Sequence, residues 1–173
     1  MQDSHRQIVL MLIAVFTILQ LVILVVFGYT PYPDSGGYLY FAQEALHYRE
    51  PYPVTSLIND YPFLWNIGSI NITVISLALF HSIAPLLVVY ALMKGITAWL
   101  FYELTRKICG SQTAFIALII YIIYPANYGE CTSLLSELPF MFCIMSGVYL
   151  TIVKDKTLFG GMLLAIANWF RPR

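Results

Sequence analysis

The sequence predicts an all-α protein, a polytopic bundle of about five transmembrane helices, from its composition and its apolar runs. Hydrophobic residues make up 60% of the chain and charged residues only 10%, whereas a soluble domain carries about 25% charged residues. The mean hydropathy is +0.76. Apolar runs long enough to cross a ~30 Å hydrocarbon core recur along the chain. Residues 1–173 are therefore predicted to form a single transmembrane domain.

The first predicted span runs from Ile8 to Gly28 and contains no charged residue. It is too long for the apolar core of a signal peptide, and no small-residue cleavage site follows it. His5 and Arg6 precede it. Because basic residues favour the cytoplasmic side of a span, we expect the N-terminus to lie inside.

A polar stretch rich in Pro and Gly, from Tyr29 to Pro62, follows the first span. Within it, Ser35 to Tyr48 has the pattern of a short amphipathic helix, and its apolar face comprises Tyr38, Phe41, Ala42, Ala45 and Leu46. The prolines at positions 51 and 53 end this helix. A second apolar run, Phe63 to Phe80, contains five interspersed Asn, Ser and Thr residues.

Four more spans are predicted in the second half of the chain. They are Leu86 to Ile108, Thr113 to Tyr128 with a bend at Pro125, Leu138 to Val153, and a last one from Leu158 to Phe170. The first of these ends in the basic residues Arg106 and Lys107, and Lys154 and Lys156 follow the third.

The charges constrain the topology. If all these basic residues are cytoplasmic, Leu86 to Ile108 runs from outside to inside. Because the first span runs the other way, Phe63 to Phe80 should be a re-entrant or membrane-surface helix, and its polar residues suit that position. The alternative, a full crossing, would put Arg106 and Lys107 outside. Residues 29–85 are thus expected to be the first extracytoplasmic loop.

The same topology gathers acidic residues on the extracytoplasmic side. Asp34 begins the amphipathic helix, where it is either an N-cap or a carboxylate at the membrane boundary that serves as a general base. Glu137 lies at the start of a predicted span, where an anion is also favourable for electrostatic reasons. Glu130, in the same loop, could play either part. Asp60 stands in a turn-like Asn-Asp-Tyr-Pro sequence.

Two cationic residues fall within or near the membrane. Arg171 follows the last span and lies roughly 20 Å along it from Leu158, so it should point at an anion or a watery cavity. Lys94 lies inside the Leu86–Ile108 span. For Lys94, a role in binding and an interfacial position reached by its long side chain are equally consistent with the sequence.

Other site chemistries find little support. The equal numbers of basic and acidic residues, nine each, argue against a nucleic-acid partner. The sequence has no phosphate-binding glycine loop and no metal-ligand cluster of His and Cys. We interpret Cys109, Cys131 and Cys143 as packing residues. Asn71 begins a glycosylation sequon, but within an apolar run we expect no glycan there.

Several short motifs share their order with a known family. They are Pro33 to Tyr38 (PDSGGY), Asp60 to Leu64 (DYPFL), Tyr102 to Gly110 (YELTRKICG), Ile123 to Pro125 (IYP), Ser136 to Pro139 (SELP) and Arg171-Pro172. With these motifs the chain resembles the GT-C superfamily of membrane glycosyltransferases, in the branch of protein O-mannosyltransferases and bacterial aminoarabinose transferases. Members of that family are much longer, so the resemblance is to an N-terminal module.

The resemblance implies roles for individual residues. Asp34 would be the catalytic acidic residue, Glu137 the acid of the second loop, and Arg171 part of a pair near the sugar donor. Tyr38, Asp60 and Lys94 are further candidates for substrate binding. Relatives often carry a second acid where this chain has Ser35, so a divalent metal requirement stays open, and no other cofactor is expected.

The expected function is glycosyl transfer at the extracytoplasmic face of a multi-pass protein, with a bacterial plasma membrane as the expected location. A polyprenyl-phosphate-linked sugar would be the donor, and a hydroxyl group of a lipid, glycan or protein the acceptor, with inversion at the sugar carbon. Membrane lipids would be the other partners. The alternatives are a fragment of a polytopic transporter or lipid flippase, and a non-catalytic membrane subunit.

Overall fold

The computed structural model describes residues 2–54 and 66–171, and these residues contain helices and no strand. The predicted all-α class is therefore confirmed for the described part of the chain. In chain order the elements are α1 (Gln2–Phe27), α2 (Pro33–Tyr48), α3 (Ile67–Phe80), α4 (Ala84–Cys109), α5 (Ser111–Ile123), α6 (Ala126–Gly129), the 3₁₀ helix η2 (Glu130–Thr132), α7 (Glu137–Ile152) and α8 (Thr157–Phe170).

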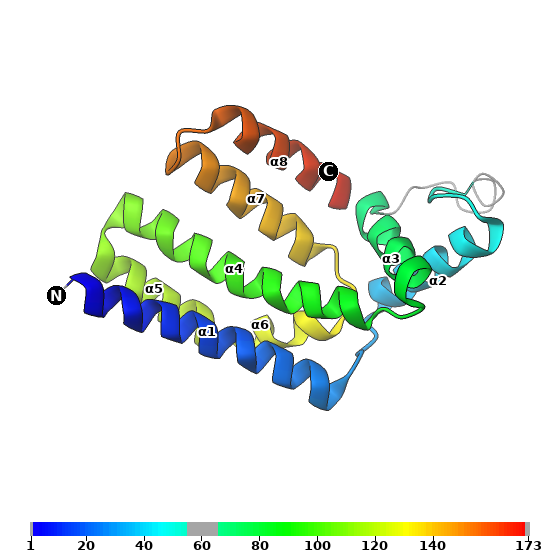
Figure 1. The fold of residues 1–173 in the computed structure, drawn as a ribbon, viewed down its shortest axis with the longest axis horizontal. Coiled ribbons are helices and arrows are strands. Elements are labelled where there is room, and N and C mark those ends of the chain that lie inside the picture. Colours follow the sequence, from blue (N-terminus) through cyan, green and yellow to red (C-terminus); the bar gives the residue numbers. More distant parts are fainter. Residues whose placement is uncertain (1, 55–65, 172–173) are drawn as a thin grey trace.

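The long helices lie side by side along one axis, with α4 in the middle (Figure 1). Helices α1 and α5 cover one side of α4, and α7 and then α8 lie on the other. The N-terminus, the α4–α5 turn and the α7–α8 turn share one end of the bundle. Helices α2 and α3, the start of α7 and the end of α8 share the other end. We call this second end the α2–α3 end.

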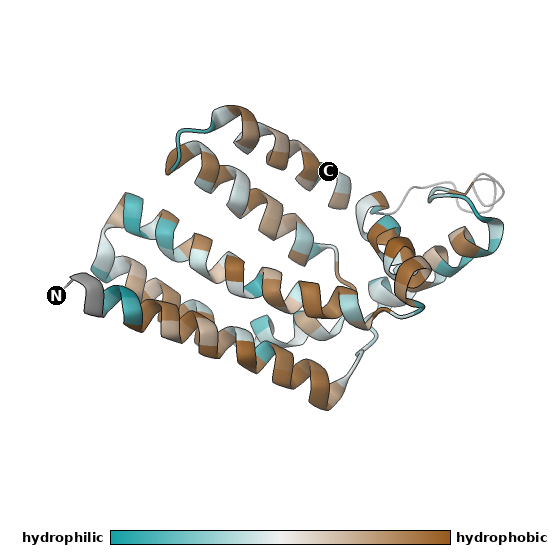
Figure 2. Ribbon diagram, in the orientation of Figure 1, coloured by the Kyte–Doolittle hydropathy of each residue, from teal (hydrophilic) through white to brown (hydrophobic). Residues whose placement is uncertain are grey.

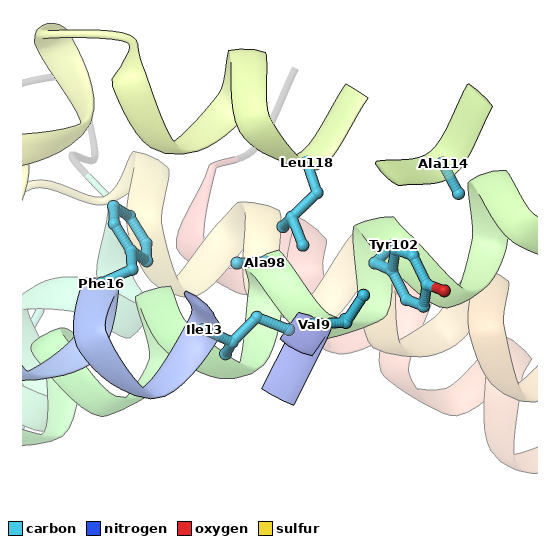
Figure 3. Packing of buried hydrophobic residues seen from close by; sticks show 7 residues of the cluster. All are labelled: Val9, Ile13, Phe16, Ala98, Tyr102, Ala114 and Leu118. Carbon is cyan, nitrogen blue, oxygen red and sulfur yellow. The ribbon is translucent and has the colours of Figure 1, made fainter. Parts of the chain in front are cut away.

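A core of aliphatic and aromatic side chains joins α1, α4 and α5 (Figure 3). It contains Val9, Ile13, Phe16, Ala98, Tyr102, Ala114 and Leu118. Gly95 on α4 leaves room for the Thr17 side chain of α1, because a Cβ atom built there would stand 2.1 Å from Thr17 Oγ1. Small residues commonly permit such close approach in membrane helices.

Helices α7 and α8 form a hairpin whose close packing depends on glycine. A Cβ atom built on Gly160 would lie 2.2 Å from Thr151 Oγ1 and 2.7 Å from the carbonyl oxygen of Gly147. A Cβ atom built on Gly147 would in turn lie 2.9 Å from the carbonyl oxygen of Gly160. The two backbones therefore approach each other at this pair of glycines, where neither residue has room for a side chain.

Helices α2 and α3 pack on each other beyond the ends of the long helices (Figure 1). The predicted amphipathic helix is present, and its apolar face contacts Ile70 and Tyr52 through Tyr38, Phe41 and Ala42. The Asn71 amide accepts a hydrogen bond from the Tyr52 backbone N–H (3.1 Å) and donates one to the Tyr52 carbonyl (2.8 Å). This side chain, the sequon asparagine, thus fastens the chain after α2 to α3.

Within the described residues, two helices are long and apolar enough to cross a membrane, the His5–Phe27 part of α1 and α4. The bent pair formed by α5 and the α6–η2 segment is a third candidate. In the ribbon of Figure 2, most of α1 has the colour of hydrophobic residues, and α4 alternates hydrophobic with more polar segments. Helices α3, α7 and α8 are apolar but only 14, 16 and 14 residues long. Of the five predicted spans, two or three therefore have spanning length.

The predicted Thr113–Tyr128 helix is interrupted at the proline that was expected to bend it. Helix α5 ends at Ile123, Tyr124 is extended, and the chain turns by 59° into α6. Pro125 cannot donate to the helical ladder. Two carbonyl groups near the end of α5 gain side-chain donors instead: Asn127 Nδ2 donates to the Tyr121 oxygen (2.5 Å) and the Tyr128 hydroxyl to the Ile122 oxygen (2.7 Å). The break thereby leaves both carbonyls hydrogen-bonded.

Candidate functional site

A cavity of about 310 Å³ lies between α4, α5, the α6–η2 segment and α7. Its volume falls in the range of small-molecule sites, roughly 300–1,000 Å³. Lys94, Glu130 and Glu137 give it a charged part, and Phe101, Leu138, Met141 and Met145 give it an apolar part, with Thr97, Tyr121 and Asn127 completing the lining. Three residues singled out from the sequence, Lys94, Glu130 and Glu137, thus share one cavity.

Lys94 is a buried cation that makes an ion pair with Glu130. It lies ten residues into the 26-residue helix α4, roughly 15 Å from the start of that helix. Its side chain is only 7% exposed, whereas that of Glu130 is 33% exposed. The Lys94 side chain therefore packs inside the bundle, against Glu130. Because η2 follows the break at Pro125, that break brings Glu130 to Lys94.

Glu137 and Arg171 form a second ion pair at the α2–α3 end. Arg171 Nη1 lies 2.8 Å from Glu137 Oε1, and both side chains are partly exposed. Arg171 reaches this position because α8 ends at Phe170, beside α3. A Cβ atom on Gly68 would lie 2.9 Å from the Trp169 carbonyl oxygen. Arg171 was expected to point at an anion, and in this structure the anion that it meets is the Glu137 carboxylate.

A hydrogen-bond network connects α2 to Glu137. The Tyr38 hydroxyl donates to Ser136 Oγ (3.4 Å) and accepts from Asn66 Nδ2. Asn66 Nδ2 also donates to Ser136 Oγ (2.8 Å), which in turn donates to Glu137 Oε2 (3.3 Å). The network holds the start of α7 against α2 and α3.

The environment of Tyr38 keeps its phenol protonated. Burial raises the pKa of the Tyr38 hydroxyl, and the negative charges of Asp34 and Glu137 act in the same direction. The hydrogen bonds with Ser136 and Asn66 act against this rise. Both carboxylates therefore favour the protonated form of the same hydroxyl.

Asp34 is exposed and is the second residue of α2, after Pro33. The alternative that Asp34 is an N-cap is therefore wrong, because the N-cap position belongs to Tyr32. Ser35 closes the first turn instead: its Oγ accepts from the Tyr32 N–H (2.7 Å) and donates to the Tyr32 carbonyl (2.9 Å). The Asp34 carboxylate is left facing outward in the first turn, where the helix dipole favours an anion.

The last expectations from the sequence concern Asp60, a metal site and the cysteines. Asp60 lies outside the described residues. Within residues 2–54 and 66–171, no three His, Cys, Asp or Glu side chains come close enough together to hold a metal ion. The three cysteines are free.

Sequence reasoning missed the neutral members of the site. Ser136 and Asn66 link Tyr38 to Glu137, and Thr97 and Asn127 line the cavity. The signal for Asn66 was a polar residue at the edge of an apolar run. Thr97 carried a helical signal, since it lies three residues after Lys94 and therefore on the same face of α4.

In comparisons with known proteins, no family model, curated protein or solved structure matches this chain.

Proposed function

We propose that the chain carries part of the active site of a membrane glycosyltransferase that uses a polyprenyl-phosphate-linked sugar. The proposed acceptor is a hydroxyl group on a lipid, glycan or protein at the extracytoplasmic face. A donor of this kind has an anionic phosphate and an apolar chain. The cavity offers matching groups, a buried cation at Lys94 and an apolar wall formed by Phe101, Met141 and Met145.

In the proposed reaction the acceptor oxygen attacks the anomeric carbon of the sugar. Asp34 takes the proton of the acceptor hydroxyl as general base. The bond between the anomeric carbon and the phosphate oxygen breaks, and the polyprenyl phosphate leaves with the bonding electrons. Arg171 and Lys94 stabilise the negative charge that develops on the phosphate. A single displacement of this kind inverts the configuration of the sugar carbon.

The observation that carries the proposal is the grouping of charged residues at the α2–α3 end and in the adjoining cavity. Arg171 is held at Glu137, and Glu137 in turn lines the cavity together with Lys94. The hydrogen-bond network of Tyr38 and Ser136 connects this group to α2, which carries Asp34. Asp34 is an exposed carboxylate at the start of the helix that this network joins to Glu137, and such a position suits a base that must meet both donor and acceptor.

The test replaces Asp34 with Asn in the gene that carries this sequence and measures sugar transfer in isolated membranes. Asn keeps the size of the side chain but cannot take up the acceptor proton, so transfer should fall ~10²–10⁴-fold. Glu103→Gln is the matched control, because Glu103 pairs with Arg106 at the other end of α4. Near wild-type transfer by Asp34→Asn, at equal membrane abundance, would show that the base lies elsewhere.

One observation favours a second candidate, a transporter or lipid flippase. Transporters often combine interrupted helices with ionisable residues inside the membrane. Here α5 is interrupted at Pro125, and the interruption places Glu130 on the buried Lys94. Reconstituted protein that moves a fluorescent lipid across vesicles, with no loss in Asp34→Asn, would favour this function over transfer.

A further inference from the structure

We infer that Glu130 occupies the place of a ligand phosphate at Lys94, and that an amphiphilic phosphate enters the cavity by displacing the Glu130 carboxylate. The inference rests on the proposed function and adds a device that controls access to its cavity. The occupant would be a phosphate group attached to an apolar chain. Its phosphate would take over the ion pair with Lys94, and its chain would lie along the apolar wall.

The charges of the cavity require such an exchange. Lys94 is neutralised by Glu130, and Glu137 is neutralised by Arg171. A phosphate added beside both pairs would bring an uncompensated negative charge into a poorly hydrated space, which is costly. If Glu130 withdraws as the phosphate arrives, Lys94 remains paired and the charge balance near it is kept for a singly charged headgroup.

The two partners differ in their freedom to move. Lys94 is 7% exposed and lies within the long helix α4, so it cannot reach water without disturbing that helix. Glu130 is 33% exposed and begins the three-residue element η2, after Gly129. Its carboxylate can therefore move away from Lys94 with less disturbance of the packing than a movement of Lys94 would cause. Glu130 is the partner that leaves.

The cavity also fits the apolar part of the ligand. From Lys94 to Phe101 along α4 the wall extends roughly 10 Å, and Glu137 to Met145 along α7 covers a similar length. Leu138 and Met141 lie between. Methionine side chains adapt readily to flexible apolar groups. The charged residues thus line one part of the cavity, and the rest of its lining is mainly apolar.

The experiment measures binding of dodecyl phosphate to the purified full-length protein that carries this sequence, in a neutral detergent, by native mass spectrometry. Glu130→Gln should bind it at least about tenfold more tightly than wild type, a difference of ~1.4 kcal/mol, because the competing carboxylate is gone. Lys94→Gln should abolish binding both in the otherwise wild-type protein and in combination with Glu130→Gln. Glu103→Gln, which removes an acid at the far end of α4, should bind like wild type.

One additional variant and one additional probe complete the test. Glu130→Asp retains the charge on a shorter side chain and should show tighter binding than wild type even if the Gln variant fails to fold. Inorganic phosphate tests the source of the anion: binding as tight as that of dodecyl phosphate would overturn the assignment of the apolar wall.

The remaining outcomes separate this inference from the function on which it rests. Equal binding by wild type and both Glu130 variants, lost in Lys94→Gln, would overturn the exchange but leave the phosphate site at Lys94. Absence of dodecyl phosphate binding in every folded variant would overturn both the exchange and the phosphate site at Lys94.

Discussion

Ser35 does the work at the start of α2 that an Asp N-cap would do elsewhere. It is fully buried, and its hydroxyl exchanges two hydrogen bonds with the Tyr32 backbone while also accepting one from the Tyr29 hydroxyl (3.3 Å). Asp34 makes its contribution through charge alone, as an anion in the first turn. Stability and chemistry at this helix start therefore belong to adjacent residues.

This division predicts different costs for neighbouring substitutions. Ser35→Ala should lower the free energy of unfolding by about 1–2 kcal/mol, because it removes the turn-closing bonds. Asp34→Asn should cost less than about 1 kcal/mol, since only a favourable charge at the helix start is lost. Thermal unfolding of the purified variants in detergent checks the order. A larger loss for Asp34→Asn than for Ser35→Ala would contradict it.

Tyr38 gives a prediction on alkaline stability. Its pKa is raised in the folded protein, so the folded state holds the phenolic proton more tightly than the unfolded chain, whose tyrosines ionise near pH ~10. The contribution is fully present below that pH and is lost as the pH rises through the folded pKa. Unfolding midpoints of wild type should therefore fall more steeply above pH ~10 than those of Tyr38→Phe.

Tyr38→Phe is a matched comparison for wild type, because it removes only the Tyr38 hydroxyl and retains every other tyrosine of the chain. It should also be less stable at neutral pH by about 1 kcal/mol, from the lost hydrogen bonds with Ser136 and Asn66. Parallel curves for the two proteins from pH 8 to 11 would show that Tyr38 ionises as it does in the unfolded chain.

Between helices, the α7–α8 hairpin offers a test of close packing. In Gly160→Ala the new methyl group would overlap Thr151 and the Gly147 backbone, which should destabilise the protein by about 1–3 kcal/mol. Gly161→Ala is a matched control on the same helix, since a Cβ atom there meets nothing within 4 Å. Denaturant unfolding in detergent compares the two. Equal stability of both variants would refute the close approach.

The helices themselves could be predicted well where apolar residues run without interruption. The expected boundaries of Leu86 to Ile108 and of Leu158 to Phe170 differ from those of α4 and α8 by at most two residues. The Thr113–Tyr128 prediction extended the helix past Pro125, because apolarity continues there although the backbone cannot. Spanning length was overestimated for α7 and α8, where the run of apolar residues says little about depth in a bilayer.

Across the whole chain, the arrangement of the ends predicts which loops share a membrane face. The basic residues Arg106 and Lys107 close α4, and Lys154 and Lys156 stand between α7 and α8. These elements lie at the end of the bundle that also holds the N-terminus (Figure 1). Since basic residues favour the cytoplasm, we expect the α2–α3 end to lie outside.

Cysteine labelling checks this expectation in a Cys109→Ser background. A membrane-impermeant maleimide added to spheroplasts should label Gln43→Cys on α2, before α3 in the chain, and Ser82→Cys, after α3. It should not label Ser111→Cys at the α4–α5 turn. Ser111→Cys should react only after the membrane is opened. Labelling of Gln43→Cys and Ser82→Cys from opposite sides would mean that the segment between them crosses the membrane.

The charged residues of the site could be predicted from the sequence, but their ion-pair partners could not. Lys94, Glu130, Glu137 and Arg171 stand out because ionisable residues are scarce in this apolar chain. The sequence could not say which acid meets which cation, because pairing depends on the 59° break after α5 and on where α8 ends against α3. Those are properties of helix packing, which short motifs do not encode.

The contact of Gly68 with the end of α8 has a consequence for biosynthesis. About a hundred residues separate Gly68 from Phe170, and a ribosome adding ~5–20 residues per second needs roughly 5–20 s to make them. During that interval α3 lacks the surface formed by Trp169 and Phe170, and Glu137 lacks Arg171. The helix pair that carries Asp34 is made early but is fixed against its last neighbour only when α8 has been synthesised.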